Sequence, residues 1–255
     1  MYLGIFIVSL AVLLKASDWF VNAAERIGLS FGIPPFVIGV TIIAFGTSLP
    51  ELASSIAAVL SGESEIVIGN AVGSNITNIA LVLGVVAIVG SKIVLEKDLM
   101  KIDMPLLLGS AALLWFIVRD QHVSLLEAII LLVGLFVFLV YSFQDDTNVP
   151  GEAIVKAGWR SYVQLIAGGA LVYFGADYTI LGISKLSAAA GISPEIIALS
   201  LVALGTSLPE LIVSISAARK GQTEIAVGNV IGSNIFNTYA VVAIPSFFGS
   251  LKIPG

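Results

Sequence analysis

Hydrophobic residues run through this chain in long stretches that are separated by short polar segments. Most stretches reach about 18 residues, the length that an α-helix needs to cross a bilayer. Backbone groups in lipid must bond within the segment, and the stretches lack the alternation of a barrel strand, so each predicts a helix. Eight spans are expected, near residues 2–24, 36–60, 66–90, 104–118, 124–143, 161–186, 194–218 and 224–250, of which the fourth is short.

Composition agrees with this pattern. Hydrophobic residues make up 58% of the 255 residues and charged residues 11%, and the mean hydropathy is +1.05, whereas a soluble domain carries about 25% charged residues. The sequence therefore predicts an all-α polytopic membrane protein. With no cysteine, disulfides and thiolate metal sites are excluded. We expect small inorganic cations and the lipid bilayer as partners, with no nucleic acid and no obligate protein partner.

The basic residues predict the orientation. With the N-terminus outside, the inner loops hold eight Lys and Arg residues and the outer segments three, which agrees with the positive-inside rule. No basic residue precedes the first apolar run, and Lys15 and Asp18 lie inside it, so we expect a retained helix rather than a signal peptide. A multi-pass protein of the cell membrane with an external N-terminus is predicted.

The chain contains an internal duplication. Residues 46–51 read GTSLPE and recur identically at 205–210, an offset of 159 that also pairs GNxxGSN at 69–75 with 228–234. The first unit crosses the membrane five times, so the second copy should be inverted. We expect a first repeat of five helices at 1–143, a short cytoplasmic linker at 144–160 and a second repeat at 161–255. Residue 255 corresponds to residue 96, so we expect three helices in the second repeat, with the last two helices of a five-plus-five fold absent from this chain. The chain is then either a fragment of a ten-helix protein, which we favour, or an unusually short member.

The repeated GTSLPE motif places Glu51 and Glu210 in the middle of apolar spans, beside prolines. Intramembrane carboxylates are costly and usually functional. Pro50 and Pro209 remove a backbone donor, so both helices should be interrupted and carbonyls freed nearby. These carbonyls and the two carboxylates, together with the hydroxyls of Thr47, Ser48, Thr206 and Ser207, would form an all-oxygen cluster. Hard cations such as Ca²⁺, which takes 6–8 oxygens, prefer such a cluster to transition metals.

The second motif supplies neutral oxygens from Ser74 and Ser233, with Asn78 and Asn237 one helical turn further on. Its glycines favour close helix packing. Intramembrane Ser and Thr also bond carbonyls of their own helix, so a structural role for any one hydroxyl stays open. Asp18 has Lys15 three residues earlier, which predicts a structural ion pair.

The paired GTSLPE and GNxxGSN segments resemble the α-repeats of the Ca²⁺/cation antiporter superfamily, in its prokaryotic sodium/calcium exchanger branch. The resemblance implies an inverted five-plus-five helix fold, no cofactor, and exchange of three Na⁺ for one Ca²⁺ by alternating access. It also implies a central Ca²⁺ site made by Glu51, Glu210 and the carbonyls of Thr47 and Thr206. The implied flanking Na⁺ sites use Ala203, Thr206, Ser233, Ser74 and Glu51 on one side, and Ala44, Thr47, Ser48, Ser74, Ser233 and Glu210 on the other, with Asn78 and Asn237 completing the middle.

Other functions remain to be weighed. A proton/calcium exchanger comes second, because relatives of that branch carry an acidic residue where this chain has Gly73 and Gly232. A cation channel is a remote alternative, since channels usually build a filter from several subunits. An enzyme is not expected: the single histidine, His122, lies in a loop, and no GxSxG motif is present.

Overall fold

The computed structural model describes residues 2–90, 93, 95, 98–144, 157–191 and 205–252. The first repeat contains α1 (Tyr2–Ser30), α2 (Pro35–Ile38), α3 (Ala44–Thr47), α4 (Leu49–Leu60), α5 (Glu65–Thr77), α6 (Leu83–Val89), α7 (Asp103–Ile117) and α8 (Leu125–Gln144). The second contains α9 (Trp159–Ala189), α11 (Leu208–Arg219) and α12 (Thr223–Phe236). Three π-helical segments continue these helices: η1 (Gly39–Ile43), η2 (Asn78–Val82) and η4 (Asn237–Val241).

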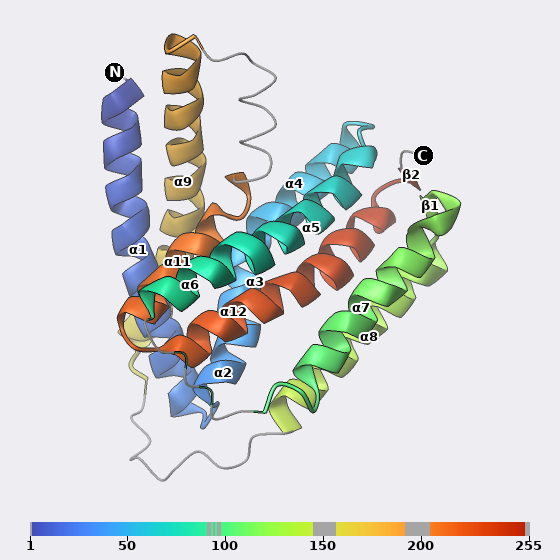
Figure 1. Cartoon of the computed structure of the whole chain (residues 1–255), viewed down its shortest axis with the longest axis horizontal. Coiled ribbons are helices and arrows are strands. Elements are labelled where there is room, and N and C mark those ends of the chain that lie inside the picture. Colours follow the sequence, from blue (N-terminus) through green and yellow to red (C-terminus); the bar gives the residue numbers. More distant parts are fainter. Residues whose placement is uncertain are drawn as a thin grey trace.

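Short elements complete the chain. Two 3₁₀ turns lie at η3 (Val118–Asp120) and η5 (Pro245–Phe247). Two-residue strands β1 (His122–Val123) and β2 (Leu251–Lys252) pair antiparallel, with His122 opposite Lys252. This pairing, which the hydrophobic pattern did not predict, ties the start of α8 to the end of the described chain (Figure 1).

Six helical stretches of the described residues are long and apolar enough to cross a membrane: 2–30, 35–60, 65–89, 125–143, 159–182 and 223–247. They correspond to six of the eight expected spans. The expected span at 104–118 appears as α7, a helix of 15 residues. The expected span at 194–218 falls partly on residues 192–204, which lie outside the described residues, and its remainder forms α11. The all-α prediction is confirmed.

The two repeats are inverted relative to each other. In Figure 1, α1 and its equivalent α9 run in opposite directions, and so do α5 and α12. Local structure is duplicated as well. Gly62 and Gly221, which are equivalent residues, both have a left-handed backbone, with φ of 80° and 76°. Each ends a helix in a conformation that glycine adopts without steric cost, so the same turn is built twice.

Helices α1 and α9 pack closely against each other, and Figure 1 shows them side by side. Three glycines of α9 face α1, and an added Cβ would lie within 3.1 Å of its backbone at each: Gly168 against Phe20, Gly175 against Leu13 and Gly182 against Phe6. The three glycines of α9 and the three residues that they face on α1 are each spaced by seven residues. Small residues on α9 therefore let the two antiparallel backbones approach along their length.

The expected helix interruptions are present at both GTSLPE segments. Ser48 separates α3 from α4 with φ −84° and ψ 2°, and Ser207 precedes α11 with φ −85° and ψ 4°. Each serine is followed closely by Pro50 or Pro209, near the first position of a helix, where the missing N–H costs least. The π-helical η1 upstream of Ser48 was not predicted from the sequence.

The broken helices lie in the middle of the molecule. In Figure 1 the α1–α9 pair stands on one side and the α7–α8 hairpin on the other, with α2 to α6, α11 and α12 between them. One apolar cluster joins α1 and α9 to α11 and α12, and a second joins α7 and α8 to α5 and α12. The segments with the repeated polar motifs are therefore held between two apolar cores.

Candidate ion-binding site

The two motif carboxylates are completely buried. Glu51 lies in the first turn of α4 and Glu210 in the first turn of α11, and each is 0% exposed. They are close enough to repel each other electrostatically. Ser48 Oγ donates to Glu210 Oε1 at 3.3 Å. The other Glu210 oxygen and both Glu51 oxygens have no hydrogen-bond partner of standard geometry, although Thr206 lies beside the Glu51 carboxylate.

Hydroxyl groups connect the two repeats around these carboxylates. Thr47 Oγ1 donates to Asn229 Oδ1 at 3.1 Å and lies 3.3 Å from Ser233 Oγ. The equivalent pair on the other side is Ser74 and Thr206, whose hydroxyl oxygens are 3.0 Å apart. Each broken helix therefore meets the second motif of the opposite repeat, and the four hydroxyls expected from separate motifs come together.

Two asparagines complete the buried polar region. Asn78 and Asn237 begin the π-helical segments η2 and η4, and each is 0% exposed. Neither amide has a hydrogen-bond partner on its oxygen or its nitrogen. A buried amide without a partner is costly, so these side chains are available to a ligand or to water.

The remaining predicted residues differ in position and in contacts. Ala44 is buried at the start of α3, and its carbonyl accepts hydrogen bonds from Ser48 N at 3.0 Å and Thr47 Oγ1 at 3.3 Å. Ser207 is buried, and its Oγ has no partner. Ala203 lies outside the described residues.

Sequence reasoning missed a supporting pair of contacts. Asn70 Nδ2 donates to Ser55 Oγ at 3.0 Å, and the equivalent Asn229 Nδ2 donates to Ser214 Oγ at 2.9 Å. Asn70 also donates to the carbonyl of Glu51 at 3.1 Å. Ser55 and Ser214 are both fully buried. The signal that could have found them is the offset of 159, which relates these two serines as it relates the glutamates.

The donor set fits a cation. Two buried carboxylates cannot both remain charged without compensation, and the ion pairs found among the described residues, Lys101 with Asp98 and Lys220 with Asp18, involve neither glutamate. Within those residues, no three acidic, cysteine or histidine side chains gather as a typical metal cluster. The available ligands are thus two carboxylates and many neutral oxygens, a set that suits Na⁺ or Ca²⁺.

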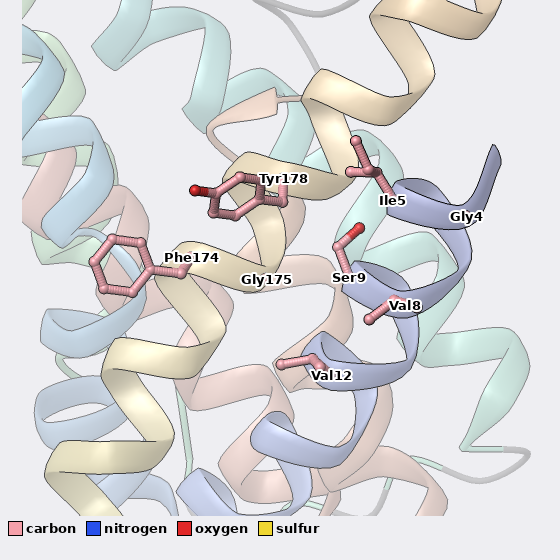
Figure 2. Close-up of a pocket in the computed structure, with 8 residues that line it drawn as sticks. All are labelled: Gly4, Ile5, Val8, Ser9, Val12, Phe174, Gly175 and Tyr178. Carbon is pink, nitrogen blue, oxygen red and sulfur yellow. The ribbon is translucent and has the colours of Figure 1, made fainter. Parts of the chain in front are cut away.

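A hollow between α1 and α9 has a different chemistry. Figure 2 shows it lined by residues of α1, including Val8 and Val12, and of α9, including Phe174 and Tyr178. Its lining is almost wholly apolar, with Ser9 hydrogen-bonded to Thr179 at 3.0 Å. This groove lacks carboxylates and is no candidate for an ion site.

Comparison with known proteins identifies the family. The sequence profile of the family described as sodium/calcium exchanger protein matches residues 1–144 and 160–255. The chain belongs to the sodium/calcium exchanger family. This is a family of membrane exchangers and not a family of enzymes. The ions are cargo, and no cofactor is required.

Individual relatives cover nearly the whole chain. It is 38% identical over 254 residues to an uncharacterised membrane protein of Methanocaldococcus jannaschii, covering 96% of this chain and 81% of that protein. It is 35% identical to the sodium/calcium exchanger MaX1 of Methanosarcina acetivorans, covering 98% and 83%. A solved structure of the sodium-calcium exchanger NCX_Mj superimposes with a TM-score of 0.85 at 38% identity, covering 99% of this chain and 83% of that one.

Membership and geometry together make this chain a multi-pass membrane exchanger of cations. The structural similarity confirms the exchanger fold expected from the repeats. The chain spans about four fifths of the length of these relatives.

Proposed function

We propose that this protein exchanges Na⁺ for Ca²⁺ across the cell membrane by alternating access at one shared site. The observation that carries the proposal is the pair of fully buried carboxylates, Glu51 and Glu210. Three of their four oxygens have no hydrogen-bond partner. Two carboxylates about 5 Å apart repel by roughly 3 kcal/mol at an effective dielectric of about 20. The site therefore needs a cation or protons in every state, and that requirement couples the ion fluxes.

The proposed ligands come from equivalent positions of both repeats. The central site would use the two glutamates and the carbonyls of Thr47 and Thr206. The flanking sites would use the hydroxyls of Ser48, Ser74, Ser207 and Ser233 and the carbonyls of Ala44 and Ala203, with the amides of Asn78 and Asn237 in the middle. Support for these ligands comes from the short contacts of Thr47 with Ser233 and of Ser74 with Thr206. The similarity to MaX1, a sodium/calcium exchanger, supports Na⁺ and Ca²⁺ as the two exchanged ions.

The excess of basic residues in the expected inner loops supports an external N-terminus and a cytoplasmic linker at 144–160, between repeats at 1–143 and 161–255. We infer no nucleic-acid partner and no obligate protein partner, because the proposed ligands all come from one chain.

The test uses the purified protein in proteoliposomes. Radioactive Ca²⁺ uptake is measured with an outward Na⁺ gradient, and separately with a pH gradient of the same size. Uptake driven by Na⁺ alone supports the proposal, whereas uptake driven only by the pH gradient would favour a proton/calcium exchanger. Uptake without any counter-ion gradient, dissipating as through a pore, would indicate a channel.

A matched control is available just after α4, the helix that carries Glu51. Glu63 is an exposed carboxylate just beyond the end of α4. Glu63→Gln should leave uptake unchanged, whereas Glu51→Gln should remove it. Equal effects of the two substitutions would mean that surface charge rather than the buried site governs transport.

A further inference from the structure

The α1 and α9 helices carry equivalent aspartates with different partners. Asp18 of α1 accepts a hydrogen bond from Ser216 Oγ at 2.6 Å and forms an ion pair with Lys220 Nζ at 3.1 Å. Lys220 also donates to the Asp18 carbonyl and to Asn22 Oδ1, each at 3.1 Å. Lys15, the partner expected from sequence spacing, is not the ion-pair partner, so that prediction is wrong. These contacts attach α1 to the C-terminal end of α11.

The equivalent contact on the α9 side cannot form. The residues equivalent to Ser216 and Lys220 are Ala57 and Ser61, which offer Asp177 no ammonium group. Asp177 instead lines a cavity of about 520 Å³ together with Ala57, Asn70 and Thr206. Since Thr206 lies beside Glu51 and contacts Ser74, this cavity leads from Asp177 to the ion-binding site.

Burial differs in the same way at other equivalent positions. Ile66 lines the cavity and is 47% exposed, whereas its equivalent Ile225 is 0% exposed. Ile180 also lines the cavity, and its equivalent Val21 is completely buried. Among the described residues, the Asp177 side therefore borders a cavity, whereas the equivalent positions on the Asp18 side are buried.

We propose that the ion pair between Lys220 and Asp18 holds α1 against α11 and thereby closes the approach to the ion-binding site on the α1 side. The inference rests on alternating access as proposed above. In an inverted-repeat transporter the two access states are related by exchange of the repeats, so the closed contact between α1 and α11 in one state corresponds to a contact between α9 and α4 in the other. The ion pair strengthens only the contact between α1 and α11. It therefore biases the protein toward the state in which the Asp177 cavity is open.

Two consequences follow for the open approach. Asp177, which has no ion-pair partner among the described residues, would attract incoming cations into the cavity that it lines. With the N-terminus outside, Lys220 would lie on the cytoplasmic side and the cavity would face the exterior. Lys220 would then make the two faces of the exchanger unequal although their ion ligands are equivalent.

Cysteine labelling tests this closure, and the chain has no cysteine of its own. Ile225→Cys reports on the closed approach and Ile66→Cys on the open one, each reacted with a water-soluble maleimide. Lys220→Ser should raise the labelling rate at position 225 and lower it at position 66 by about twofold to fivefold, the range that part-exposed ion pairs contribute. Asp18→Asn should do the same, and the double variant should add little, because both remove one interaction.

Arg219→Ser is the matched control, since it removes the same charge from the neighbouring, exposed position. An unchanged labelling ratio in both Lys220→Ser and Asp18→Asn would overturn the proposal, as would an equal change in Arg219→Ser. Lys220→Arg, which keeps the charge, should retain the original ratio. The labelling does not depend on which ion drives transport: a failure of Na⁺-driven uptake with a shifted labelling ratio would refute the ion assignment and leave the closure standing.

Discussion

The two repeats have the same ion-ligand chemistry and different surroundings. Glu51 and Glu210 are equally buried, and the serines before their helices have backbone angles that agree within a few degrees. Yet in the most apolar 18 residues of the span at 65–89 only 22% of the residues are buried, against 89% in the span at 223–247. Duplication has therefore reproduced each local ligand segment, while the packing around the two segments differs among the described residues.

The difference has a direct structural cause at α12. An added Cβ on Gly228 would lie 2.5 Å from the carbonyl oxygen of Phe36, and on Gly232 2.4 Å from that of Val40. Backbone of α2 and η1 therefore presses directly on α12, while α7 and α8 cover another side of this span. The comparison shows that ligand identity is a local property of each repeat, whereas the burial of α12 depends on its contacts with α2 and η1, whose equivalents at 194–202 lie outside the described residues.

The largest expected effect tests whether the two halves of the site are chemically equal. Glu51→Gln and Glu210→Gln should each reduce Ca²⁺ exchange by about a hundredfold or more, because losing one partner of a buried charge interaction costs about 3–5 kcal/mol. Initial rates of Na⁺-driven Ca²⁺ uptake in proteoliposomes measure this. A variant that keeps full activity would show that its glutamate is not shared by the ions.

A smaller effect should separate the halves by packing. Gly232→Ala forces a methyl group against Val40 and should lower thermal stability, with a cost of about 1–3 kcal/mol for overpacking. Its equivalent Gly73 has nothing within 4 Å of an added Cβ in the described part of the chain, so Gly73→Ala should be close to neutral. Melting curves in detergent compare them. Equal losses would mean that both halves are packed alike, contrary to the structure.

The smallest effect concerns the two ions. Ser74→Ala and Ser233→Ala each remove one neutral oxygen and no charge. Na⁺ gains less than Ca²⁺ from each carboxylate and depends more on neutral oxygens, so the Na⁺ concentration for half-maximal exchange should rise by about twofold to tenfold, the value of one or so kcal/mol per hydrogen-bonding group. The Ca²⁺ dependence should change less. Equal losses for both ions would mean that these serines hold the helices together instead of binding sodium.

Periodic features were the most predictable from the sequence. Apolar runs located six spans, and the prolines located the interruptions at Ser48 and Ser207, because both effects act within a few residues of the chain. The fixed offset between the motifs predicted that their polar residues would meet, and Thr47 with Ser233 does so. The π-helical η1 and the β1–β2 pairing were missed, since neither follows from hydrophobic pattern or turn residues.

The sequence by itself determined the fold class, the inverted duplication and the kind of oxygen atoms that line the site, since each is written as a repeated local pattern. Only the tertiary structure decided that Asp18 pairs with Lys220, that Ser48 reaches Glu210 and that the cavity opens beside Asp177. These contacts join residues far apart in the chain, and the Asp18–Lys220 pair lies on helix faces where the repeats have diverged. Their outcome depends on how non-equivalent surfaces pack together, and a pattern read along one helix does not contain that information.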